Sequence, residues 1–109
     1  MYKRQVIFRR RRFGDLIERQ LAFFEEEHAG LLHDVRKAET AYDRSERDEA
    51  EERYGDYVDL VDTGTELLAG IRDAYSATLD EETAARYEDE FNRTAARRLP
   101  QFALELGET

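Results

Sequence analysis

The chain has 109 residues, the size of one domain with a modest core, and it contains no cysteine, which excludes disulfides and thiolate chemistry. No apolar run approaches the ~20 residues that span a bilayer, and no secretory signal is recognisable, so we expect a cytoplasmic protein. The net charge is −9, and an acidic protein repels phosphates, so nucleic acid is not expected to bind the body of the chain.

Residues 1–12 form a basic arm ahead of a single helical domain predicted over residues 13–109. The arm holds six bases and no acid, so the remainder, with eleven bases and twenty-six acids, carries −15. Residues 1–5 resemble a translated adapter sequence, in which case they have no biological role. Four consecutive arginines follow: Arg9, Arg10, Arg11 and Arg12. They could tether the chain to an anionic membrane or to nucleic acid, but we favour a solvated lead-in that neutralises the acidic body.

Residues 13–42 are predicted to form the first long helix. Its apolar positions follow a 4-3 spacing, which indicates a heptad seam on one face. The seam consists of Ile17, Leu21, Phe24, His28, Leu31, Val35, Ala38 and Tyr42. Gly30 lowers the helix propensity by about 1 kcal/mol, which a helix of this length can absorb. Seven consecutive polar residues follow over 43–49, and we expect the chain to turn there.

Residues 46–79 are predicted to return antiparallel as the central helix. Five apolar residues recur at spacings of three, four or seven, as one face of a helix requires: Tyr57, Leu60, Leu67, Ile71 and Ala74. Val61, Leu68 and Tyr75 widen this stripe beyond a two-helix seam, so the helix requires a packing partner on each side. The stripe keeps its phase across Gly64, so we predict a continuous helix there. We expect Gly64 to let a third helix approach closely.

The sequence Leu60-Val61-Asp62-Thr63-Gly64-Thr65 resembles the active-site signature of retroviral-type aspartic proteases. In that family two carboxylates, one from each chain of a homodimer, share a proton and activate water. The loop that carries them belongs to an all-β fold, whereas here the motif lies inside a helical stripe, in a chain with one proline. We therefore interpret these residues as part of the central helix.

A third, shorter helix is predicted from the N-cap Asp80 to Leu99, where Pro100 disfavours further helix. Its inner face consists of Ala84, Tyr87, Phe91 and Ala95. The alternation of Phe102, Leu104 and Leu106 predicts an extended C-terminal tail across the bundle. The predicted fold class is therefore all-α: an antiparallel hairpin of two long helices plus a shorter third helix, which makes a three-helix bundle.

The third helix is shorter than the other two, so we expect it to cover only the lower half of the hairpin. Seven apolar residues at the hairpin tip are left with two-helix coverage: Leu31, Leu32, Val35, Tyr42, Tyr54, Tyr57 and Val58. An exposed apolar surface of that size usually belongs to an interface. We therefore predict a non-enzymatic interaction protein without a cofactor, which acts by self-association as a homo-oligomer or by docking a partner helix at the tip.

The segment Glu25-Glu26-Glu27-His28 contains the Glu-x-x-His spacing of ferritin-like di-iron carboxylate bundles. The resemblance implies an alternative function, in which Glu25 and His28, with Asp62 at the edge of the facing helix, bind iron or manganese in a site completed on dimerisation. A full site also needs a second Glu-x-x-His, which the sequence lacks. Otherwise His28 is a seam histidine bonded to a backbone carbonyl or to Asp62 or Thr65.

Overall fold

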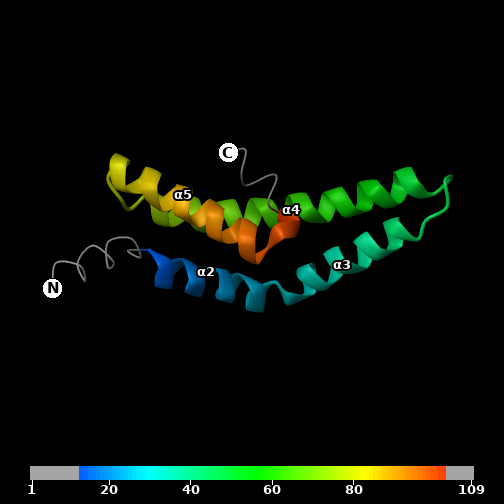
Figure 1. The fold of residues 1–109 in the computed structure, drawn as a ribbon, viewed down its shortest axis with the longest axis horizontal. Helices are drawn as coiled ribbons and strands as arrows, with labels where there is room; N and C mark the ends of the chain where they lie inside the picture. The colour runs from blue at the N-terminus through cyan, green and yellow to red at the C-terminus, as the bar shows by residue number, and fades with distance from the viewer. Residues whose placement is uncertain (1–12, 103–109) are drawn as a thin grey trace.

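The computed structural model describes residues 13–102, and this part of the chain consists of helices and turns without a strand (Figure 1). Four α-helices and one 3-10 helix follow in order: α2 (Gly14–Glu27), α3 (Ala29–Asp43), α4 (Ala50–Ser76), α5 (Glu81–Arg98) and η1 (Pro100–Phe102). The molecule is elongated, with extents of 62 × 24 × 23 Å. The predicted all-α class is confirmed, but the described residues form four α-helices, where three were predicted.

The prediction of one continuous helix over residues 13–42 is wrong. The helix is interrupted at His28, whose backbone has φ −118° and ψ 34°. The amide of His28 still donates to the carbonyl of Phe24 at 2.9 Å, so the chain bends between α2 and α3 without unwinding. Figure 1 shows the two helices meeting at an angle. The heptad spacing did not reveal the break, because the seam keeps its phase across it.

α3 and α4 pair as an antiparallel hairpin whose tip is the turn over residues 44–49 (Figure 1). The predicted hairpin of two long helices is not confirmed, because its first helix is divided into α2 and α3 and its central helix spans Ala50–Ser76 instead of 46–79. α4 runs through Gly64 without interruption, which confirms the predicted continuity of the central helix. α5 begins after Asp80, whose carboxylate accepts a hydrogen bond from the Thr83 amide at 3.4 Å. It ends at Arg98, one residue before the predicted end.

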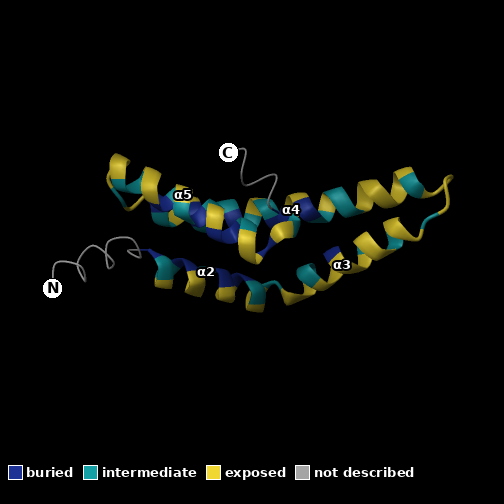
Figure 2. Cartoon of the chain, viewed as in Figure 1, coloured by how far each residue is buried: buried dark blue, intermediate teal, exposed yellow. Residues whose placement is uncertain are grey.

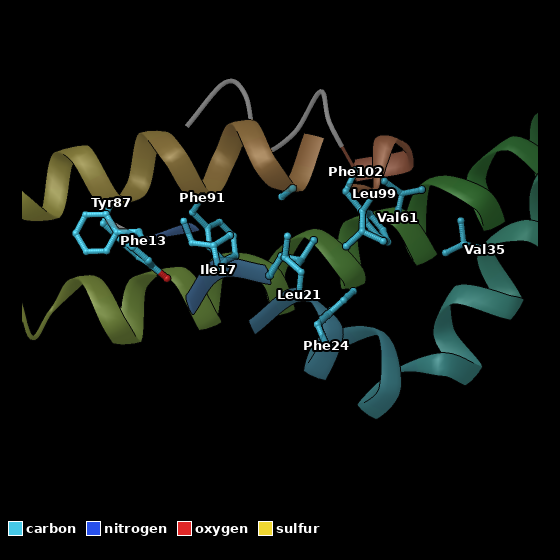
Figure 3. Packing of buried hydrophobic residues seen from close by; sticks show 12 residues of the cluster. Phe13, Ile17, Leu21, Phe24, Val35, Val61, Tyr87, Phe91, Leu99 and Phe102 are labelled. Carbon is cyan, nitrogen blue, oxygen red and sulfur yellow. The ribbon is translucent and has the colours of Figure 1, made fainter. Parts of the chain in front are cut away.

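The core lies where α5 packs against both α2 and α4 (Figure 2). Twelve buried apolar residues form the core cluster, and Val35 is the member that lies on α3: Phe13, Ile17, Leu21, Phe24, Val35, Val61, Leu68, Tyr87, Phe91, Ala95, Leu99 and Phe102. Figure 3 shows Phe13 and Tyr87 at one end of this cluster and Leu99 with Phe102 and Val61 near the other. Towards the hairpin tip most residues of α3 and α4 are exposed, as the yellow segments of Figure 2 show.

Polar contacts fix the position of α5 on its two neighbours. The guanidinium of Arg72, which is buried, donates from Nη1 to Oδ1 of Asn92 at 3.0 Å. The hydroxyl of Ser76 donates to Glu88 on the next turn of α5. On the α2 side, the hydroxyl of Tyr87 donates to Gln20 at 2.8 Å. These contacts restrict how α5 can slide or rotate, because buried polar groups must keep their partners.

Gly64 is buried, but the expectation that the third helix takes the space beside it is wrong. The three atoms nearest to a Cβ built on Gly64 all belong to the ring of Phe102 in η1, with Cζ at 2.5 Å. Phe102 is fully buried, so η1 folds back onto α4 and closes one end of the core. The rest of the predicted extended tail, with Leu104 and Leu106, lies outside the described residues.

Candidate interaction groove

A groove of about 690 Å³ lies between α3, α4 and the junction of α5 with η1, and we call it the tip groove. Its apolar lining residues are Leu32, Val35, Tyr54, Tyr57, Val58, Val61, Leu99 and Pro100. Its polar lining residues are Glu25, Arg36, Glu39, Asp62, Arg98 and Gln101. α5 stops beside the groove because Pro100 disfavours helical geometry at the preceding residue. The groove therefore continues, towards the tip, the face of α4 that α5 covers.

Five of the seven residues predicted at the interface line the tip groove: Leu32, Val35, Tyr54, Tyr57 and Val58. Val35 is only 2% exposed, so its side chain already packs within the chain. Leu31 and Tyr42 do not line the groove. Leu31 is half-buried and packs against the core, whereas Tyr42 is exposed.

The tyrosines at the tip form a ring cluster, which we call the tyrosine cluster and which comprises Tyr42, Tyr54 and Tyr57. The ring centroids of Tyr42 and Tyr54 are 5.3 Å apart, and those of Tyr54 and Tyr57 are 6.5 Å apart. Tyr54 is 52% exposed, so one side of the cluster faces solvent. Aromatic rings in this arrangement could stack on apolar or cationic groups of a ligand.

Arg98 at the end of α5 is fully engaged with α2. Its Nη1 lies 2.6 Å from Oε1 of Glu18 and its Nη2 lies 2.8 Å from Oε1 of Glu25. These hydrogen bonds, first to Glu25 and then to Glu18, raise the pKa of Arg98. Two acids of α2 therefore already neutralise Arg98 at the groove. The other base that lines the groove is Arg36.

The tip groove has a negative electrostatic environment. Glu39 and Asp62 line it, and neither forms an ion pair with any residue in the described range 13–102. Burial raises the pKa of Tyr57, and the negative charge of Glu39 raises it further, followed by the influence of Tyr54 and Asp43. A ligand of this groove is therefore better accommodated if it carries positive charge.

The surface around the groove is acidic as well. Residues 29–62, which include the tip, contain eleven acids and five bases, a net charge of −6. Eight of these acids lie on α4 or on the turn and end of α3 that flank the tip: Asp43, Glu46, Asp48, Glu49, Glu51, Glu52, Asp56 and Asp59. Each is exposed, and none forms an ion pair within residues 13–102.

Of the three residues of the metal-site alternative, Glu25 and Asp62 both line the tip groove, whereas His28 does not. Both carboxylate oxygens of Glu25 bond to Arg98, at 2.8 and 3.2 Å. His28 is half-buried at the helix junction, with its ring centroid 5.1 Å from that of Phe24. Among the described residues no three acidic or histidine side chains are placed to bind a metal ion. The hypothesis requires two chains, so the single chain does not test it.

The segment that resembles a protease signature, residues 60–65, is helical throughout and lies inside α4. Asp62 therefore stands on a helix, one turn from Asp59, and does not lie in a loop. Thr63 and Thr65 donate their hydroxyls to carbonyls four residues earlier, at 3.0 and 2.9 Å, as helical residues do. This agrees with the interpretation of these residues as part of the central helix.

The basic patch of Arg9, Arg10, Arg11 and Arg12 lies outside the described residues. Within residues 13–102 none of the helices combines the length and hydrophobicity needed to cross a bilayer.

Comparison with protein-family models, with curated proteins and with solved structures found no match to this chain.

Several residues of the groove were not predicted from the sequence, namely Arg36, Glu39, Arg98, Leu99, Pro100 and Gln101. For Leu99, Pro100 and Gln101 the only signal in the sequence was the proline, which marks the end of the third helix. Glu39 and Arg36 carried no signal, because charged residues on the wet side of a helix are common.

Proposed function

We propose that this chain is a non-enzymatic, cytoplasmic interaction protein that binds a helix or a second copy of itself in the tip groove. The observation that carries the proposal is the groove itself, which runs between α3 and α4 and is lined by aliphatic and tyrosine side chains together with charged ones. Proteins that dock an amphipathic helix use grooves of this kind. In this proposal the α3–α4 hairpin is a short coiled coil whose open side receives a third helix.

The composition of the groove limits the affinity. Full burial of an aliphatic or aromatic side chain contributes about 1.5–3 kcal/mol, but Leu32, Tyr57 and Val58 are already half-buried in the single chain. Association also costs translational and rotational freedom. We therefore expect micromolar association, in the range where binding is reversible and responds to concentration.

Val58→Asp tests the proposal. The substitution places a charge among the apolar residues that line the groove. Val58 is not one of the buried core residues, so helix content should be retained. We expect a loss of self-association or of partner binding, measured by light scattering over a dilution series. Ala22→Asp is the matched control, because it adds the same charge to an exposed helical position outside the groove. Equal association of the two variants and the wild type would contradict the proposal.

A further inference from the structure

We propose that the occupant of the tip groove is the arginine-rich segment of residues 6–12 from a second copy of this chain. The inference rests on the proposed function, since it requires that the groove binds a segment, and it names that segment. Residues 6–12 lie outside the described part of the structure, so their sequence alone is used: Val-Ile-Phe followed by four arginines.

Charge complementarity is the first reason. Glu39 and Asp62 in the groove form no ion pair within residues 13–102, and the acids that flank the tip are equally unpaired there. Residues 29–62 carry −6, whereas residues 6–12, the proposed occupant, carry +4 with no acid. The segment that bears the groove and its proposed occupant thus have charges of opposite sign. Complementary potentials favour encounter and disfavour other partners.

The chemistry of the side chains is the second reason. A guanidinium can lie flat on a tyrosine ring and at the same time pair with a carboxylate, which a lysine ammonium does less well. The tyrosine cluster presents the half-exposed ring of Tyr54, and Glu39 and Asp62 line the same groove. The three apolar residues that precede the arginines can cover the apolar lining residues Val58 and Leu32. One short segment therefore matches both the apolar and the acidic residues that line the groove.

The length of the chain decides between the same molecule and a second one. Phe13 is buried, with its ring centroid 5.4 Å from that of Tyr87, at the end of the molecule opposite the tip (Figures 1 and 3). Arg9 precedes Phe13 by four residues, so it can reach at most about 14 Å from it. α2 alone spans about 21 Å, and the tyrosine cluster lies farther along, at the far end of α3. The arginines of one chain therefore cannot reach its own tyrosine cluster.

This contact has a salt dependence opposite to that of a symmetric contact between two tips. A tip-to-tip dimer brings like charges together, so added salt would strengthen it by screening. An arginine segment in an acidic groove is held partly by attraction between opposite charges, so added salt weakens it. The salt dependence of the assembly therefore separates the two arrangements.

A complementation experiment with full-length chains tests the proposal. The arm variant carries Arg9→Gln, Arg10→Gln, Arg11→Gln and Arg12→Gln and keeps its groove. The groove variant carries Val58→Lys, which places a positive charge in the groove to repel the arginines, and it keeps its arm. Lys3→Gln with Arg4→Gln is the control for loss of charge outside the segment. Circular dichroism checks that all variants are folded, and light scattering over a dilution series gives their masses.

We expect each variant alone to self-associate about tenfold or more weakly than the wild type, and the control to associate normally. An equimolar mixture should regain a mass of two chains, because the arm of the groove variant fits the intact groove of the arm variant. Salt should weaken this assembly.

If only Val58→Lys weakens association, the groove functions but its occupant is not the arm, and this inference fails while the proposed function stands. If neither variant weakens it, both fail. A mixture that stays monomeric, an assembly that salt strengthens, or a wild type that is monomeric throughout would each overturn the arm-in-groove contact.

Discussion

The ring of Phe102 occupies the space beside Gly64 in which the side chain of any other residue would stand. A Cβ on Gly64 would lie 2.5 Å from Cζ and 3.3 Å from Cδ1 of that ring, and both residues are buried. Gly64, in the middle of α4, thus leaves room for the ring of Phe102, which belongs to η1 at the C-terminal end of the described chain. This contact holds η1 against α4. It thereby positions Leu99 and Pro100, which line the tip groove.

Gly64→Ala is therefore expected to destabilise the protein by about 1–3 kcal/mol, because the ring must move out of a packed position. The gain in helix propensity, at most about 1 kcal/mol, offsets only part of this loss. Gly70→Ala is the control in the same helix: nothing lies within 4 Å of its Cβ, and it should stabilise. Denaturant unfolding measures both. A stabilising Gly64→Ala would show that Phe102 does not pack against α4.

Phe91→Ala is expected to lower the free energy of unfolding by about 3–5 kcal/mol, because the side chain is fully buried where α5 meets the rest of the core. Phe23→Ala is the matched control, since Phe23 is 61% exposed and its truncation should leave stability nearly unchanged. Denaturant unfolding of the two variants gives the difference. A loss below about 1 kcal/mol for Phe91→Ala would mean that α5 is not docked.

Because of the raised pKa of Tyr87, we expect the free energy of unfolding to fall at high pH. Burial raises the pKa of Tyr87 from 10.0 to about 12, although the hydrogen bond to Gln20 lowers it in part. The folded state thus holds this proton more tightly than the unfolded chain. The stabilisation is complete below pH 10 and is lost as the pH rises to about 12. Tyr87→Phe should flatten this part of the curve of unfolding free energy against pH. A variant with the wild-type slope would exclude Tyr87 as its source.

The parts of the fold that follow from local chemistry could be predicted. Asp80 marked the start of α5 through its side chain, Pro100 marked its end, and the unbroken phase of the apolar stripe predicted a continuous α4. The bend at His28 could not be predicted, because heptad spacing reports which face of a helix is apolar and says nothing about its axis. The bend has a tertiary role. Because α5 packs against both α2 and α4, α5 needs room between these two helices.

The site was predictable only in part. The apolar tip residues were found because they exceed what a short third helix can cover, and most of them do line the groove. Phe102 was placed in an extended tail, since the sequence could not show that η1 folds back to meet Gly64. The depth and charge of the groove depend on that contact and on the position of Arg98, which are both tertiary features.

The most direct measurement of the central claim is the mass of the wild-type chain by sedimentation equilibrium, over a dilution series at low and at moderate salt. The tip groove is expected to be filled in solution, so the mass should exceed that of one chain at tens of micromolar and should fall towards one chain on dilution. A mass of one chain at every concentration in both salts would contradict self-association through the groove.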